Sequence, residues 1–269
     1  MKKIFMTLFL VVAMAVPCSA ATTYNSSSRV QAVGEQLLTK SGIPASNIKF
    51  MVVSDEPNNS NFISTKVINV STAELAFAGN DNETAAVVAN EIGHIILGHS
   101  ARGKVMSLLQ ANAGAEVTTS TQVQTFAQNF QTTKEDKEAD LVAVNLMVNA
   151  GYNPLAAIVV YTKQTGTYWD TIVGRPANAE KALNIYDYIE YAYPAKLKVG
   201  YGCNEYRTFL EFAQAQTAAR KDSKKLVKKH EKNYKKAQKN TANAITKFKT
   251  RGGVSGWDAV YGLLNNAQQ

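Results

Sequence analysis

Apolar residues recur along the chain with two kinds of spacing, one typical of helices and one typical of strands. This spacing predicts where helices and strands lie. Residues 29–40 carry apolar side chains at three- and four-residue spacing, which is typical of an amphipathic helix. Residues 47–54 and 66–72 are short and rich in β-branched side chains, and we predict two strands there, with a turn-rich loop at 55–61. The first part of the chain is therefore predicted to hold a helix and a small sheet.

The rest of the chain is predicted to be helical. Cap residues at 80–82 precede a strongly apolar stretch, so we predict a helix that runs at least to His99. Residues 204–250 are expected to form one long polar helix or a pair, which the glycines at 252–256 end. Further helices are predicted at 134–151, from the Asn-Pro pair at 153–154 onward, and at 175–193.

These elements predict an α+β fold that is mostly α-helical, with a small early sheet. No internal repeat is evident. We divide the chain into a signal peptide at 1–20, a globular domain at 21–200, and a long basic helical extension at 201–269.

The first twenty residues have the composition of an export signal. Two lysines precede a short apolar run at 4–16, and small residues follow up to Ala20, where cleavage is expected. We therefore predict an exported protein, periplasmic or otherwise extracytoplasmic, that is soluble or peripherally attached. No later stretch reaches the roughly 20 apolar residues of a transmembrane helix, so no span is expected in the mature chain. Cleavage would remove Cys18 and leave Cys203 without an intramolecular disulfide partner.

The net charge of +8 is concentrated in one segment of the extension. Residues 220–251 contain thirteen Lys or Arg against two acidic residues, so this segment carries +11 and the remainder sums to −3. Such a run is usually a solvated helix; the functional alternative is attachment to an anionic envelope surface. Nucleic acid is not an expected partner, because the chain has no recognisable nucleic-acid-binding module.

The stretch Asn90–His99, NEIGHIILGH, differs by one residue from the zinc-protease motif H-E-x-x-H. Residues 90 and 94 lie one turn apart on the same face of a helix, with Glu91 beside them. In H-E-x-x-H helices the two His bind zinc and the Glu acts as general base. On a continuous helix His99 falls on the face opposite Asn90, so we expect a structural role for it.

The helix predicted at 134–151 carries two carboxylates, Asp136 and Asp140, in the sequence DKEAD. Residues at i and i+4 share one face, so this pair can supply a metal ligand and a carboxylate that orients a ligand. Glu135 and Glu138 face other directions and are expected to be solvated.

Four segments together resemble a known family: NEIGHIILGH, DKEAD, GYNP at 151–154, and GRPANAEKALNI at 174–185. In order and spacing, over about residues 28–195, they are similar to the HtpX-like and Oma1-like gluzincin zinc metallopeptidases. That group includes the CaaX prenyl protease and periplasmic proteases of the BepA type. SNFISTKVINVS also resembles the family's N-A-F segment and the edge strand beside its substrate cleft. The resemblance implies a gluzincin-type metallopeptidase domain at 21–200, polypeptide substrates, and one zinc per chain in an active member.

By this resemblance, three residues keep the family's pattern. Glu91 takes the position of the catalytic general base, and His94 that of the second zinc ligand. Asp140 takes the position of the carboxylate that orients the first zinc ligand.

Three further positions depart from the family's pattern, and all three belong to the metal site. Asn90 stands where the first His ligand is expected, Asp136 replaces a Glu ligand, and Arg175 replaces a His near the metal. Asp keeps the charge of Glu with a shorter reach, but a neutral amide is a poor zinc ligand. Without a metal, water keeps a pKa near 15.7, and Glu91 has nothing to activate.

Two functions are therefore open. In the first, the protein is a metalloendopeptidase of the cell envelope, in which Glu91 moves the proton of a zinc-bound water. His94 and Asp136 hold the metal, with help from Asn90 or water. In the second, it is a pseudoenzyme whose cleft and strand at 66–72 bind extended polypeptide by strand addition, as a chaperone-like or scaffold protein. The Asn90 side chain is then expected to form a hydrogen bond with Asp140.

Overall fold

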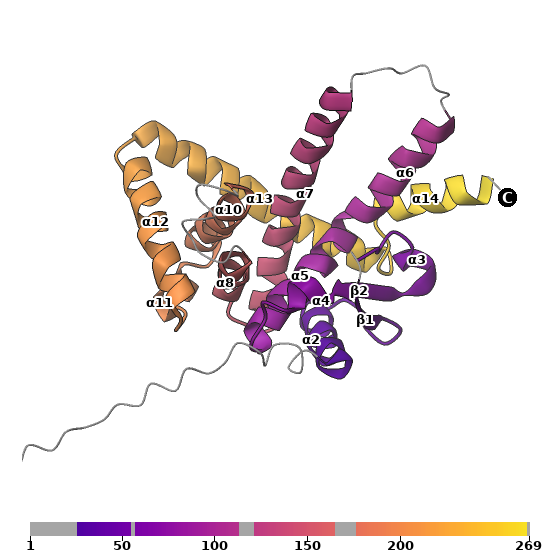
Figure 1. Cartoon of the computed structure of the whole chain (residues 1–269), viewed down its shortest axis with the longest axis horizontal. Coiled ribbons are helices and arrows are strands. Elements are labelled where there is room, and N and C mark those ends of the chain that lie inside the picture. The colour runs from indigo at the N-terminus through magenta and orange to yellow at the C-terminus, as the bar shows by residue number, and fades with distance from the viewer. Residues whose placement is uncertain (1–25, 55–56, 113–120, 165–175, 268–269) are drawn as a thin grey trace, which may run out of the picture.

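The computed structural model describes residues 26–54, 57–112, 121–164 and 176–267. Most of these residues lie in helices, and one two-stranded sheet lies near the N-terminal end of the described chain (Figure 1). The predicted class, α+β and mostly α-helical, is confirmed. Within the described ranges, no helix is both long and apolar enough to cross a membrane. The signal peptide predicted at 1–20 lies outside them.

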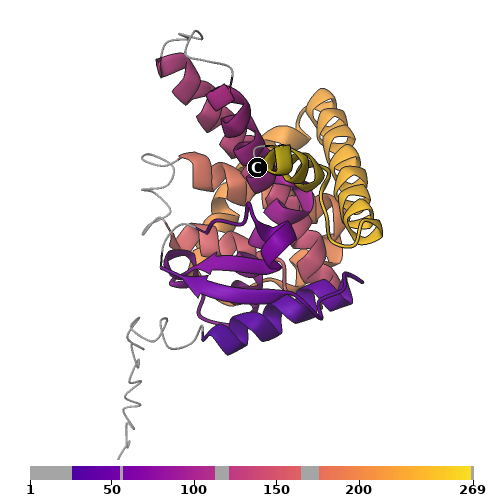
Figure 2. The ribbon, with the colours of Figure 1, turned by 90° about the vertical axis from the view of Figure 1, so that its right-hand side faces the viewer.

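The N-terminal part contains the sheet and the short helices around it. Its elements are α2 (Ser27–Lys40), β1 (Lys49–Val53), α3 (Phe62–Thr65), β2 (Val67–Ser71) and α4 (Thr72–Leu75). The strands pair in parallel, with Lys49 opposite Val67. Gly34 brings α2 close to the sheet, since a Cβ there would lie 2.3 Å from the ring of Phe50. Figure 2 shows α2 running along the two strands, so both predicted strands and the first predicted helix are present.

The middle of the chain forms three helices: α5 (Asp81–Leu97), α6 (His99–Asn112) and α7 (Thr121–Asn149). The Asn80 side chain accepts a hydrogen bond from the Glu83 N–H and caps α5, as the sequence predicts. Gly98 adopts φ +70° and ends α5, so the helix predicted to continue through residue 99 is broken there. The helices α5 and α7 cross closely at Gly93, where a Cβ would lie 2.6 Å from the Ala139 carbonyl oxygen.

The C-terminal part consists of six helices within the described residues. They are α8 (Leu155–Lys163), α10 (Pro176–Ala192), α11 (Pro194–Val199), α12 (Asn204–Lys221), α13 (Lys224–Thr250) and α14 (Gly256–Ala267). Of the two forms expected for residues 204–250, the structure has the pair, α12 and α13. The buried Asn145 amide on α7 donates to the Thr241 hydroxyl at 2.7 Å and accepts from the hydroxyls of Tyr188 and Tyr193. This polar cluster ties α13 to α7 and α10.

Candidate active-site cleft

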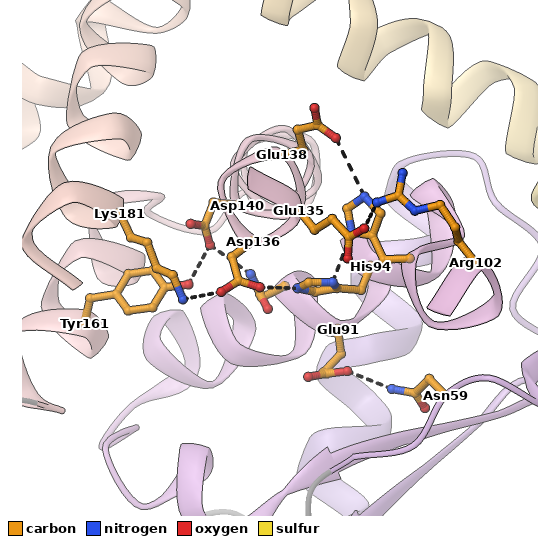
Figure 3. A network of polar contacts seen from close by, with 12 residues as sticks. Asn59, Glu91, His94, Arg102, Glu135, Asp136, Glu138, Asp140, Tyr161 and Lys181 are labelled. Carbon is orange, nitrogen blue, oxygen red and sulfur yellow. Dashed lines mark hydrogen bonds and ion pairs between the residues drawn. The ribbon is translucent and has the colours of Figure 1, made fainter. Parts of the chain in front are cut away.

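A cleft lies over α5, where α4, α7, α8 and α10 meet it. Asn90, Glu91 and His94 enter it from α5, and Asp136 and Asp140 enter it from α7. The apolar residues of α5 are buried, so this helix has to lie inside the molecule, and Gly93 lets the carboxylates of α7 approach it. The structure therefore brings together all five described residues of the predicted site. Figure 3 labels Glu91, His94, Asp136 and Asp140 among them.

Asn90 is turned toward Asp140. Its Nδ2 donates to Asp140 Oδ1 at 2.8 Å, and the hydroxyl of Tyr161 on α8 donates to the same oxygen at 2.7 Å. Asp140 is 2% exposed, and its Oδ2 is buried without a hydrogen-bond partner within the described residues. Burial raises the pKa of Asp140 to about 7, although these two hydrogen bonds act in the opposite direction. Asn90 thus acts as a donor that holds a buried carboxylate.

Glu91 is linked to the sheet. Its Oε2 accepts a hydrogen bond of 2.7 Å from the Nδ2 of Asn59. The same Asn59 amide also pairs with the backbone of Asn69 in β2, accepting from its N–H at 2.7 Å and donating to its carbonyl at 3.1 Å. Burial, and next the nearby charge of Glu74, raises the pKa of Glu91 to about 8. Burial thus favours the protonated form of the Glu91 carboxyl group.

His94 contacts a second histidine. The Nδ1 atoms of His94 and His99 lie 3.1 Å apart, and His99 Nε2 lies 3.7 Å from Glu138 Oε2. Burial, and next the charge of His99, lowers the pKa of His94 to about 4. A continuous helix would place His99 opposite Asn90, but the break at Gly98 starts a new helix and turns His99 toward His94. His99 is buried and does not line the cleft, so the structural role expected for it stays a prediction.

Asp136 lies between a histidine and a lysine (Figure 3). Its Oδ1 is 3.7 Å from His94 Nε2, and its Oδ2 is 2.5 Å from Nζ of Lys181 on α10. The Lys181 ammonium also lies 5.4 Å from the centre of the Tyr161 ring. One oxygen of the predicted metal ligand is thus already paired with a cation that belongs to the chain.

Several residues of this site were not identified from the sequence. Lys181 and Tyr161 reach the cleft from helices whose packing the sequence pattern does not specify, and Asn59 comes from the predicted loop. Glu135, expected to be solvated, forms an ion pair with Arg102 of α6. The remaining predicted site residue, Arg175, lies outside the described residues.

The residues present do not fit a catalytic zinc ion. Such an ion normally takes three protein ligands from imidazole, thiolate or carboxylate groups. Here His94 and Asp136 are two such ligands, and their facing atoms are 3.7 Å apart. The third position belongs to Asn90, whose amide nitrogen is directed to Asp140. The donor set is one ligand short, so we derive no reaction step through a metal.

A second group of possible ligands lies outside this cleft. Ligand atoms of Asp187 and Glu190 on α10 and of His230 on α13 lie within 4.8 Å of one another. However, Arg220 of α12 donates to both carboxylates at 2.7 Å, so a guanidinium already balances their charge. The His230 side chain is 13% exposed between these helices.

The helix with the pattern N-E-x-x-H is crossed by a carboxylate-bearing helix and linked to a small sheet. This arrangement places the protein in the class of metallopeptidase-like folds. The family model described as Peptidase family M48 matches residues 25–230. The chain belongs to peptidase family M48. This family is zinc-dependent in general, and membership supports a metallopeptidase-type function. The match extends beyond residue 195, where the segments that carry the resemblance end, into α13. No curated protein and no solved structure matches the chain.

Proposed function

We propose that this protein is a non-catalytic member of its peptidase family that binds extended polypeptide outside the cytoplasm. The hydrogen bond from Asn90 to Asp140 carries the proposal, because it turns the first-ligand position into a donor for a buried carboxylate. The site thereby loses the third ligand that a catalytic zinc ion requires.

The state of Glu91 supports the same conclusion. A general base needs a carboxylate oxygen free to accept a proton, but Glu91 Oε2 accepts a 2.7 Å hydrogen bond from the Asn59 amide. Glu91 then joins the cleft to the sheet through Asn59.

The proposed binding surface for a client is the edge of β2 that does not pair with β1. The backbone N–H and C=O of Asn69 both pair with the side-chain amide of Asn59, which has the same donor and acceptor groups as a peptide bond. An extended polypeptide presents peptide bonds in series and can pair with this edge after displacing the amide. We propose the chain acts as a chaperone-like or scaffold protein by this route.

Metal analysis of the purified, metal-replete protein tests the proposal. We expect well under one zinc per chain, and stoichiometric, tightly held zinc contradicts it. Casein digestion is the second measurement, with Glu91→Gln as the matched variant. The proposal predicts no cleavage by either protein, and binding of unfolded casein by both.

One observation favours a metal-dependent endopeptidase of the cell envelope as the second candidate. His94 Nε2 and Asp136 Oδ1 lie 3.7 Å apart and face each other, so they are able to share a cation. On this alternative, the protein cleaves casein, a chelator stops the cleavage, and Glu91→Gln abolishes it.

We also propose that α13 attaches the protein to an anionic membrane surface. Its inner face packs on the body through Ile245 and Phe248. Residues 224–239 include eight exposed lysines with no ion pair to an acidic residue in the described part of the chain. They are Lys224, Lys225, Lys228, Lys229, Lys232, Lys235, Lys236 and Lys239.

Vesicles test this attachment. We expect sedimentation with phosphatidylglycerol vesicles but not with phosphatidylcholine vesicles, and loss of binding at about 0.5 M salt. Replacing Lys225, Lys228, Lys232 and Lys235 by Glu should abolish binding. Equal binding to both kinds of vesicle contradicts the electrostatic proposal.

A further inference from the structure

We propose that the Lys181 ammonium is the resident cation of the cleft. It balances the negative charge of Asp136, which a metal ion would otherwise balance. The inference rests on the proposed non-catalytic function, since a chain that uses a metal needs the same carboxylate free. It adds a second reason, separate from Asn90, for weak metal binding.

The position of Lys181 is the first observation. Its Nζ lies 2.5 Å from Asp136 Oδ2, and its side chain is 16% exposed. The other oxygen of Asp136 faces His94 Nε2 at 3.7 Å, so the ammonium and the imidazole lie on either side of one carboxylate (Figure 3). The face of the Tyr161 ring, with its centre 5.4 Å away, adds a cation–π contact to the ammonium.

The charge of the cleft is the second observation. Four carboxylates line it: Glu74, Glu91, Asp136 and Asp140. Lys181 is the only Lys or Arg among the lining residues that the structure describes. Both donors to Asp140 are neutral, whereas Asp136, the predicted metal ligand, is paired with the ammonium of Lys181.

A second ion pair between α7 and α10 lies at the surface and serves for comparison. Lys137 of α7 and Glu180 of α10 lie 2.8 Å apart, and their side chains are 32% and 59% exposed. That pair joins the same two helices at the surface. Lys181 and Asp136 instead meet inside the cleft, with side chains 16% and 22% exposed. Lys137 is therefore the matched control for Lys181.

The proposal predicts a specific interaction between two substitutions. A divalent ion on Asp136 has to compete with, and is repelled by, the adjacent ammonium. Asn90→His supplies the missing imidazole but leaves this competitor in place. Only the addition of Lys181→Met frees the carboxylate, so the pair should gain more zinc affinity than the two changes give separately.

Zinc affinity is measured by competition with a chromophoric chelator. The proteins compared are the unchanged chain, Asn90→His, Lys181→Met, Asn90→His/Lys181→Met, Asn90→His/Lys181→Arg and Asn90→His/Lys137→Met. Circular dichroism checks that each protein is folded, and Lys181→Gln replaces Lys181→Met should the latter not fold. We expect Asn90→His/Lys181→Met to bind zinc at least about ten-fold more tightly than Asn90→His. The double variants Asn90→His/Lys181→Arg and Asn90→His/Lys137→Met should bind zinc with an affinity within about two-fold of that of Asn90→His.

The outcomes separate this inference from the proposed function. Equal zinc affinity with and without Lys181→Met overturns the role of Lys181. An equal gain from Lys137→Met overturns it too, because the effect is then one of net charge. Stoichiometric zinc on the unchanged chain contradicts the proposed function instead, whatever the variants show.

Discussion

The raised pKa of Glu91 predicts that this residue destabilises the fold as the pH rises. Burial of its side chain, which is 7% exposed, and the charge of Glu74 raise the pKa to about 8, against an ordinary value of 4.5. The folded protein therefore binds a proton that the unfolded chain releases at lower pH. This contribution to stability is fully present below about pH 4.5 and is lost as the pH rises through about 8.

The perturbation is Glu91→Gln, which keeps the shape and an oxygen that can accept from Asn59 but cannot ionise. Each pKa unit corresponds to about 1.4 kcal/mol, so the full difference between the two pKa values amounts to about 5 kcal/mol as an upper bound. Relaxation and water entry reduce such values, and we expect about 2–3 kcal/mol between pH 5 and pH 9. The variant should thus gain in relative stability over this range.

The assay is urea unfolding of metal-free protein, followed by circular dichroism at pH 5, 7 and 9. The quantity of interest is the change with pH in the stability difference between variant and parent, because a lost or new hydrogen bond shifts all three values alike. Glu211→Gln, at an exposed position on α12, is the matched control and should give a small, constant difference. A pH-independent difference for Glu91→Gln would refute the assignment of a raised pKa to this carboxyl group.

Two further substitutions test the packing that positions the site. Gly93→Ala places a methyl group 2.6 Å from a backbone oxygen of α7, so it should cost about 1–3 kcal/mol in urea unfolding. Gly103→Ala on α6 meets nothing within 4 Å and should raise the free energy of unfolding by up to about 1 kcal/mol. A rise in the free energy of unfolding for both variants would contradict the close crossing. Asn145→Ala removes the buried amide that joins α7, α10 and α13, and should lower the free energy of unfolding by about 2–3 kcal/mol. Asn243→Ala, on the exposed side of α13, should change it by less than about 0.5 kcal/mol, and comparable losses would show that the cluster contributes little.

The sequence by itself determined the local part of the site. The 3.6-residue period places Asn90 and His94 on one face of their helix before any packing is known. It likewise places Asp136 and Asp140 on one face of a second helix. Cap residues and apolar spacing likewise predicted α2, the start of α5, the two strands and helical structure over 204–250, with one helix or two left open there. These features depend on neighbours within a few residues, so they can be read along the chain.

The tertiary structure alone decided which groups meet across the cleft. Lys181 is forty-five residues from Asp136, and Asn59 is thirty-two residues from Glu91, so no local spacing relates them. A left-handed residue, Gly98, changes the direction of the chain and brings His99 to His94, which a continuous helix forbids.

The same distinction applies to the metal site. The pattern N-E-x-x-H predicted a change at one ligand position, and the resemblance to the family predicted changes at the Glu ligand and at a His near the metal. Only the packing of α10 on α7 showed that a lysine ammonium is paired with the carboxylate that remains. The physical reason is that helical periodicity assigns side chains to faces, whereas the charges that a face meets depend on which helix packs against it.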